Sequence, residues 1–274
     1  MATESATIVT SDAMTVTPLT GSVGARIDGV DLRQLSDAQF AEIHAAFLSH
    51  CMLVFRGQAL RIEDHLDFAQ RWGELSITPM VNYIDGYPGV LPLSNRGKER
   101  EINENWHSDS TFMAQPPKIT ILVARDIPPA GGDTMWNNQY LAYETLSDGM
   151  KRLLEGVRAK FTGTRLAKLH NHQGEIPSAY HPVVRTHPET GRKALYLNVG
   201  HTTRFVDMTV EESAPLLDFL FEHLKRPEFC CALRWEPGTM ALWDNRCAQH
   251  YPVNDYHGHR RVMHRITLKG VRPV

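Results

Sequence analysis

Residues 103–112 read Asn-Glu-Asn-Trp-His-Ser-Asp-Ser-Thr-Phe, and their centre is His107-Ser108-Asp109. In an extended strand, residues i and i+2 point to the same face, so this imidazole and this carboxylate converge on one point. Such a pair makes up two-thirds of a metal site built from two histidines and one carboxylate. The same pair also occurs on surface loops that hold no metal, so the metal interpretation requires a third ligand elsewhere in the chain.

Length and composition are those of a globular chain with room for a sizeable core. The chain has 274 residues, of which 42% are hydrophobic and 22% charged, and its formal net charge is −2. This near-neutral charge gives no reason to expect nucleic acid or an anionic membrane as a partner. No apolar run approaches the roughly 18 residues of a membrane span. The four cysteines form neither a zinc pattern nor a disulfide framework, which favours the cytoplasm.

No internal repeat or low-complexity linker divides the chain. We therefore expect a single domain over residues 15–274. Residues 1–14 are rich in Thr, Ser and Ala and lack the basic start and the apolar stretch of a signal peptide, so they are predicted to be a flexible tail.

Hydrophobic periodicity predicts a mainly β chain. Strands are expected at 15–19, 25–32, 52–55, 118–125, 182–186, 194–199, 229–235, 239–243 and 261–268. Helices are expected at 36–50, 63–72, 140–146, 148–157 and 209–225, the first and last opened by capping boxes. Residues 163–180 have no clear period and are interpreted as a long surface loop or lid. Many short strands without regular βαβ alternation favour a β-sandwich or jelly roll with flanking helices.

The end of the chain offers a third ligand and two cations. His250 lies just past the strand predicted at 239–243. On the strand predicted at 261–268, Arg261 and Arg265 share a face, so two guanidinium groups can point into one cavity. Arginine is suited to hold a carboxylate through two parallel hydrogen bonds.

With these residues in place, the sequence resembles the taurine/2,4-dichlorophenoxyacetate dioxygenase family of Fe(II)- and 2-oxoglutarate-dependent oxygenases. The resemblance runs from Pro18 to Pro273, with Arg261 at the family spacing. The matching motifs are Trp106-His107-x-Asp109-x-Thr111-Phe112, Gly131-Gly132-Asp133-Thr134, His181-Pro182-Val183-Val184-x-Thr186-His187-Pro188 and Trp243-Asp244-Asn245-Arg246-x-x-x-His250.

The resemblance implies a double-stranded β-helix, which is a jelly-roll, cupin-like fold. It implies that His107, Asp109 and His250 hold Fe(II) and so serve catalysis. It assigns the far carboxylate of 2-oxoglutarate to Arg261, helped by the hydroxyl of Thr134. With O2 as the second co-substrate, the expected reaction hydroxylates an aliphatic carbon and releases succinate and CO2.

The substrate pocket departs from the taurine enzymes of the family. The histidine and tyrosine that they carry ahead of the metal motif fall here at Thr78 and Val81, and a phenylalanine becomes His201. The anion-binding Arg265 and Asn103 are retained. We therefore expect a small anionic substrate other than taurine, such as an aryloxyalkanoate, an alkyl sulfonate or an alkyl sulfate. Hydroxylation beside the heteroatom would give an unstable product that frees a phenol, sulfite or sulfate.

Several alternatives stay open at this point. The enzyme would be a taurine dioxygenase proper, a non-redox metal hydrolase on the same scaffold, or a binding protein without catalysis. As an alternative to substrate binding, Arg265 simply pairs with a carboxylate of the fold. As an alternative to co-substrate binding, Thr134 only caps its turn. In the same way, Asn103 is then only a hydrogen-bond donor of a loop, and the other pocket candidates, Thr78, Val81 and His201, are packing residues. Family members commonly form homodimers or homotetramers, and the helix at 211–225 is a candidate contact.

Overall fold

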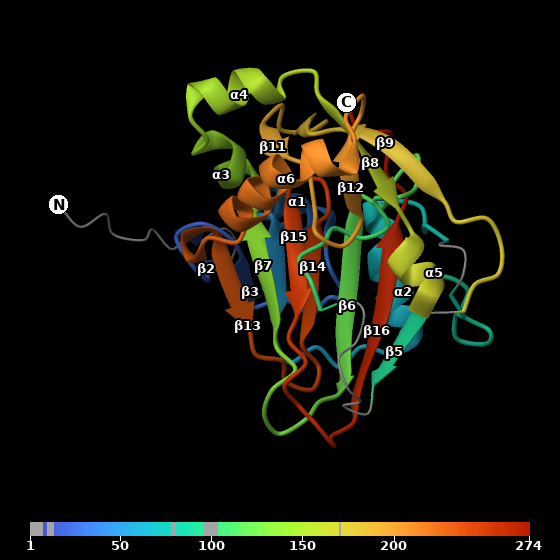
Figure 1. The fold of residues 1–274 in the computed structure, drawn as a ribbon. Coiled ribbons are helices and arrows are strands. Elements are labelled where there is room, and N and C mark those ends of the chain that lie inside the picture. Colours follow the sequence, from blue (N-terminus) through green and yellow to red (C-terminus); the bar gives the residue numbers. More distant parts are fainter. Residues whose placement is uncertain (1–7, 10–13, 78–80, 96–103, 170) are drawn as a thin grey trace.

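The computed structural model describes residues 8–9, 14–77, 81–95, 104–169 and 171–274, and its largest element is an eight-stranded sheet (Figure 1). The order across this sheet is β1-β2-β3-β4-β14-β6-β16-β5. Neighbouring strands are antiparallel except for the parallel pair β3–β4. The strands are β1 (Ile8–Val9), β2 (Thr15–Pro18), β3 (Ala25–Asp28), β4 (Met52–Phe55), β5 (Leu91–Asn95), β6 (Ile119–Asp126), β14 (Met240–Asp244) and β16 (Arg261–Leu268).

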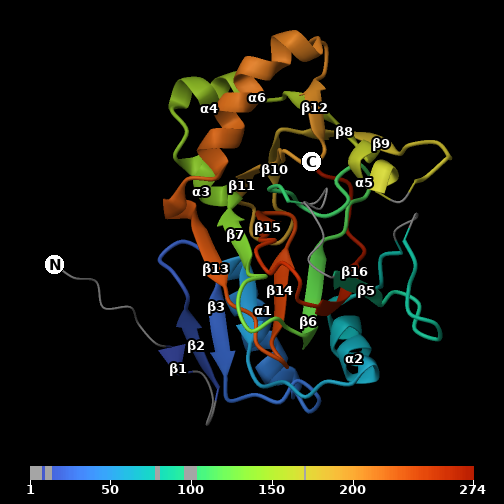
Figure 2. The same ribbon diagram turned by 60° about the horizontal axis from the view of Figure 1, so that its bottom comes forward.

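The central strand β14 shows how alternation divides the core. All five of its residues are buried. Met240 and Leu242 join the apolar cluster on the side covered by α1 (Asp37–His50) and α2 (Ile62–Trp72), which Figures 1 and 2 show against one face of the sheet. Ala241 and Trp243 point the other way, into the cluster between the sheets. Trp243 therefore faces the interior, where the candidate site lies.

A second sheet with the order β13-β7-β15 closes the other side of this inner cluster. Its strands are β13 (Cys230–Leu233), β7 (Thr134–Asn138) and β15 (Ala248–Pro252). A third sheet, β12-β8-β9, and the pair β10–β11 complete the strands. They are β8 (Arg158–Thr162), β9 (Ser178–Pro182), β10 (Val184–Thr186), β11 (Lys193–Leu195) and β12 (Thr202–Phe205). The mainly β jelly roll with flanking helices is confirmed.

Most of the remaining helices lie away from the main sheet. Figure 1 shows α3 (Gln139–Glu144), α4 (Asp148–Leu154) and α6 (Val210–Leu224) at one end of the molecule. The short α5 (Thr164–Leu169) and the 3₁₀ turn η1 (Pro227–Phe229) complete the set. No helix in the described ranges is long and apolar enough to cross a membrane.

The predicted helices at 36–50 and 209–225 are confirmed as α1 and α6. Ser36 and Thr209 each cap their helix through a complete capping box, with Gln39 and Glu212 as the reciprocal partners. The prediction of a long surface loop at 163–180 is wrong, because this stretch contains α5 and most of β9, whereas the prediction of a lid stays a prediction. β9 forms because its backbone pairs with β8, which local hydropathy does not reveal.

Part of the predicted N-terminal tail is described. Ile8–Val9 pair with the start of β2, and Met14 is fully buried. Residues 1–7 and 10–13 of that tail lie outside the described residues, so its flexibility stays a prediction.

Acid should destabilise the fold partly through His65, which is fully buried in α2. Burial, with the charges of Arg125 and His264, lowers the pKa of His65 to about 3. An unfolded histidine titrates near 6.5, so below that pH the unfolded chain binds the additional proton and stability falls as the pH falls. Between pH 7 and 5, a His65→Phe variant should therefore lose about 2 kcal/mol less unfolding free energy than the wild type. Urea unfolding at both pH values measures this difference, and equal losses would contradict it.

Candidate active site

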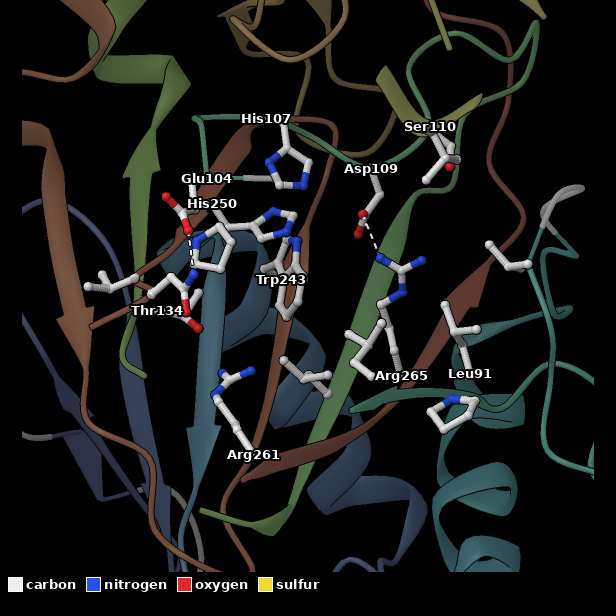
Figure 3. Close-up of a pocket in the computed structure, with 18 of the residues that line it drawn as sticks. Leu91, Glu104, His107, Asp109, Ser110, Thr134, Trp243, His250, Arg261 and Arg265 are labelled. Atoms are coloured by element: carbon white, nitrogen blue, oxygen red, sulfur yellow. Dashed lines mark hydrogen bonds and ion pairs between the residues drawn. The ribbon is translucent and has the colours of Figure 1, made fainter. Parts of the chain in front are cut away.

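Two histidines from distant parts of the chain meet across one isolated β-bridge. The backbone N–H of His107 donates to the carbonyl of His250 at 3.0 Å, and the N–H of His250 donates back at 2.9 Å. Their ring centres lie 4.1 Å apart. The structure also brings in Asp109, and the potential ligand atoms of these three buried residues all lie within 4.8 Å of one another (Figure 3). The predicted third ligand is thus next to the first two.

Asp109 lies on the loop beyond this bridge and is held on several sides. Its backbone N–H donates to Asn245 Oδ1 at 3.1 Å. The hydroxyl of Thr120 donates to Asp109 Oδ2 at 2.6 Å and accepts from Asn245 Nδ2 at 2.8 Å. Arg265 Nη1 donates to Asp109 Oδ1 at 3.1 Å. These contacts fix the carboxylate before any metal is bound.

The protonation states suit a divalent metal. Burial lowers the pKa of His107 and lowers that of His250 well below its usual value, so both rings are neutral near pH 7. Burial alone would raise the pKa of Asp109, but the Arg265 guanidinium and the two imidazoles outweigh it, and the net pKa is low. His107 Nδ1 lies 2.8 Å from the carbonyl of Asn105, which places the proton on Nδ1 and leaves Nε2 as a lone-pair donor. Two neutral imidazoles and one carboxylate are the donor set that suits non-haem Fe(II).

A second group of potential metal ligands is already paired with other side chains of the fold. His187, Asp244 and Cys247 also lie within 4.8 Å of one another. Arg246 donates to both carboxylate oxygens of Asp244, at 2.7 and 2.6 Å, and His187 donates at 3.0 Å. A cation there would have to displace a guanidinium, so we assign this cluster to the fold.

Arg261 and Thr134, the residues predicted to anchor the co-substrate, lie on one side of the cavity (Figure 3). Thr134 is buried in β7, and its hydroxyl oxygen accepts from Trp235 Nε1 at 3.0 Å. Its own hydroxyl proton therefore remains for another acceptor. The guanidinium of Arg261 lies 6.0 Å from the Trp235 ring and 5.9 Å from the Tyr256 ring. A Cβ at Gly132 would sit 3.0 Å from Arg261 Cδ, so the glycine at this turn leaves the arginine its place.

Arg265 lies on the other side of the cavity, beside Leu91 on the paired strand β5 (Figure 3). The cavity has a volume of about 400 Å³. Its lining includes the apolar side chains Val81, Leu91, Leu93, Phe112, Leu122 and Leu166. Of the predicted pocket residues, Val81 and His201 line it, whereas Thr78 and Asn103 lie outside the described residues. Arg265 also forms an ion pair with Asp109, as the alternative interpretation of this arginine expects, and its contact with the substrate stays a prediction.

His201 forms part of the wall next to the metal-ligand group. Its ring centre lies 6.2 Å from that of His107 and 5.1 Å from that of Phe112. Its Nδ1 lies 3.2 Å from the carbonyl of Thr162, which places the ring proton there. Burial lowers the pKa of His201 to about 3, so the side chain is a neutral wall residue near pH 7.

Replacing Gly200 with alanine should weaken metal binding. An ideal Cβ at this position would lie 2.5 Å from Asn105 Oδ1 and 3.1 Å from His107 Cβ. The Asn105 side chain has to rotate away, and His107 Cβ has to shift by a few tenths of an ångström, which moves a predicted metal ligand. We expect a stability loss of about 1–3 kcal/mol and roughly tenfold weaker Mn(II) binding, measured by thermal unfolding and metal titration. Gly21→Ala is the control, because nothing lies within 4 Å of its added Cβ. Equal Mn(II) affinities in the two variants would contradict the prediction.

Three residues of the site escaped the sequence interpretation, although their signals were present. Thr120 lies on the face of β6 opposite to Ile119 and Ile121, so strict alternation would have directed it inward. Asn245 stood within a quoted motif but had no assigned role. Trp243 belongs to the same motif, and it lines the cavity with its ring centre 4.7 Å from that of His250.

Residues 15–267 match the model of the family described as Taurine catabolism dioxygenase TauD, TfdA family, and the chain belongs to that family. It is therefore a 2-oxoglutarate-dependent dioxygenase, an oxidoreductase that uses Fe(II) and takes 2-oxoglutarate and O2 as co-substrates.

Two relatives and one solved structure illustrate the similarity. The chain is 38% identical over 269 residues to an alkylsulfatase of Acinetobacter baylyi, covering 92% of this chain and 84% of the relative. It is 37% identical over 281 residues to an alpha-ketoglutarate-dependent sulfate ester dioxygenase of Pseudomonas putida, covering 94% and 90%. The crystal structure of a putative alpha-ketoglutarate-dependent taurine dioxygenase from Burkholderia xenovorans superposes with a TM-score of 0.87 at 37% identity, covering 96% of this chain and 94% of that one.

Proposed function

We propose that this dioxygenase hydroxylates the carbon next to the heteroatom of a small anionic substrate, and that the substrate is an alkyl sulfate ester. The observation that carries this proposal is the part of the cavity beyond Asp109, where the cation Arg265 lies among apolar side chains. Arg265 has five N–H donors, and Asp109 engages it through Nη1, so further N–H groups remain for an anion. An alkyl chain would lie against Leu91, Phe112 and Leu166. Aryloxyalkanoates and alkyl sulfonates share this chemistry, and the named relatives favour the sulfate ester.

The proposed roles of the site residues follow from this arrangement. His107, Asp109 and His250 would hold Fe(II) and carry the catalytic centre. Arg261 and Thr134 would bind the far carboxylate of 2-oxoglutarate through a guanidinium and a hydroxyl proton. We assign substrate contacts to Arg265, Val81 and His201, and also to Thr78 and Asn103, whose placement lies outside the described residues.

The bound metal with its co-substrates supplies the oxidising power for hydroxylating an aliphatic carbon, while the chain orients the substrate and excludes water. Hydroxylation of the carbon that carries the ester oxygen gives a hemiacetal sulfate. This compound breaks its C–O bond to sulfate and leaves an aldehyde. The overall balance is alkyl sulfate, 2-oxoglutarate and O2 going to aldehyde, hydrogensulfate, succinate and CO2.

A succinate-release screen tests the proposal. The panel holds taurine, longer alkyl sulfonates, alkyl sulfates of several chain lengths and both enantiomers of phenoxypropionate. We expect an alkyl sulfate to give the highest kcat/KM. Taurine as the best substrate by a wide margin would overturn the assignment and favour a taurine dioxygenase proper.

The hydrolase alternative is not supported by the comparisons, and the products separate it from the proposal. A hydrolase releases an alcohol and sulfate without O2, whereas a dioxygenase releases an aldehyde and succinate. The second anion site at Arg261 and Thr134 also has no use in simple hydrolysis.

We also propose that residues 15–274 act as one cytoplasmic domain that associates as a homodimer or homotetramer. One sheet takes strands from both ends of the chain, which supports a single domain. The four cysteines are unpaired, as expected in a reducing compartment. Val210 and Phe219 of α6 are apolar and exposed, which supports α6 as a contact. Light scattering behind a sizing column measures the oligomeric state, and a monomer would exclude this part.

A further inference from the structure

The motif His181-Pro182-Val183-Val184-x-Thr186-His187-Pro188 has no role in the site as described so far. It spans the end of β9, all of β10 and the turn beyond it. Its two histidines are each about 1% exposed, and neither lines the cavity. They therefore do not touch substrate, co-substrate or metal, and any role in the reaction must pass through other residues.

His181 holds the loop immediately after Asp109. Its Nε2 lies 2.9 Å from the carbonyl oxygen of Thr111 and 3.0 Å from that of Met113. Both oxygens are acceptors, so Nε2 carries the proton and donates to them. The same turn is closed by the N–H of Met113 donating to the carbonyl of Ser110 at 2.9 Å. One imidazole thus ties the tight turn that follows the metal-binding carboxylate to β9.

His187 holds the other segment that contacts Asp109. Its Nδ1 accepts from the backbone N–H groups of Glu189 and Thr190 at 3.2 and 3.1 Å, so its Nε2 carries the proton. That Nε2 donates to Asp244 Oδ2 at 3.0 Å. The next residue, Asn245, accepts the backbone N–H of Asp109.

The two histidines therefore reach Asp109 from both sides: one through the turn that follows it, the other through Asp244 and Asn245. This support matters because Asp109, unlike His250, lies on no named strand. A ligand on a loop keeps its geometry only if its neighbours are fixed.

We propose that His181 and His187 are positioning residues that set the place of Asp109 and thereby the affinity of the metal site. This inference rests on the proposed role of Asp109 as a metal ligand, and it is independent of which substrate the enzyme takes.

The test compares metal binding by the purified full chain in which His181 is replaced by Phe, Gln or Asn. Gln can place an amide N–H close to the imidazole Nε2 position, whereas Asn falls about one bond short. Mn(II) affinity is measured by titration and ligand geometry by the visible spectrum of bound Co(II). We expect His181→Phe and His181→Asn to bind Mn(II) about tenfold more weakly, the usual effect of losing an outer partner of a ligand, with a shifted Co(II) spectrum. His181→Gln should stay within about threefold of the wild type.

His65→Phe is the matched control, because it replaces an equally buried histidine that does not line the cavity. It is expected to change stability without changing Mn(II) affinity or the Co(II) spectrum. His187→Phe should weaken Mn(II) binding in the same direction as His181→Phe. Unchanged Mn(II) affinity in both His181→Phe and His187→Phe would overturn the proposal. So would a loss of Mn(II) affinity in His65→Phe that matches its loss of thermal stability in the same proportion as in these two variants. If His181→Phe does not fold, the Gln and Asn pair decides, and equal affinities there would overturn it too.

The same titration distinguishes a failure of the proposed metal site from a failure of the proposed substrate. If the wild type and Asp109→Ala bind Mn(II) with the same affinity, the proposed metal site is refuted, and this inference with it. Normal metal binding together with failure of every alkyl sulfate would refute only the proposed substrate.

Discussion

Replacing Asp109 with alanine should abolish 2-oxoglutarate-dependent turnover. Asp109 supplies the only negative charge in the three-residue group, and it accepts from Thr120 and Arg265. Without it, two neutral imidazoles face an uncompensated Arg265 guanidinium, which repels a cation. Loss of an outer partner of a ligand weakens metal binding by about 10–100-fold, so loss of the ligand itself should exceed roughly 100-fold. Mn(II) titration and succinate release measure the two effects.

Ser108→Ala is the control for this substitution. Ser108 lies between the two ligands, is equally buried, and only donates to the carbonyl of Ala248 at 2.9 Å. This variant should lose about 1 kcal/mol of stability and retain metal binding. An Asp109→Ala protein that still binds Mn(II) as tightly as Ser108→Ala would contradict the assignment. Asp109 forms hydrogen bonds with three separate segments of the fold, through Asn245, Thr120 and Arg265. A circular dichroism spectrum is therefore needed to show that the variant is folded.

Replacing Arg261 with alanine should mainly raise the requirement for 2-oxoglutarate. Arg261 and Thr134 lie on the side of the cavity away from Arg265, where the far carboxylate would be bound (Figure 3). Truncating one partner of a hydrogen-bonded charge pair costs about 2 kcal/mol or more, which corresponds to a roughly 30-fold higher KM for 2-oxoglutarate. Steady-state kinetics with 2-oxoglutarate as the varied substrate measures this.

Two further variants sharpen this prediction. Arg261→Lys keeps the charge but loses the planar fork, so it should recover only part of the affinity. Arg265→Ala should instead raise the KM of the organic anion. An unchanged 2-oxoglutarate requirement in Arg261→Ala, with a raised one in Arg265→Ala, would move the anchor to Arg265.

Only the pair of arginines in the site could be predicted from short-range rules, because Asp109 lies on a turn beyond the His107 bridge and not on a strand with it. Residues two apart on a strand share a face, which relates Arg261 to Arg265 on β16. The distant His250 could not be placed by any local rule, and its assignment came from the resemblance of whole motifs. The structure supplies the missing physical reason, which is the reciprocal backbone pairing of His107 and His250.

Several elements escaped prediction because polar residues are buried in them. β15 contains Gln249 and His250, which local hydropathy does not mark as a buried strand. The cost of burying Gln249 is offset by hydrogen bonds: its backbone N–H donates to Asn137 Oδ1 at 3.1 Å, and its side chain donates to the carbonyl of Leu197. Similarly, α5 lies within a stretch interpreted as a loop, yet its Leu166 lines the cavity. Such long-range pairings are absent from any window of sequence.

The most direct measurement is the stoichiometry of one reaction in sealed vessels with a medium-chain alkyl sulfate, 2-oxoglutarate and Fe(II). We expect aldehyde, sulfate and succinate to appear in a 1:1:1 ratio, and the formation of all three to stop when O2 or 2-oxoglutarate is withheld. Sulfate released together with an alcohol, at the same rate without O2 and without succinate, would contradict it.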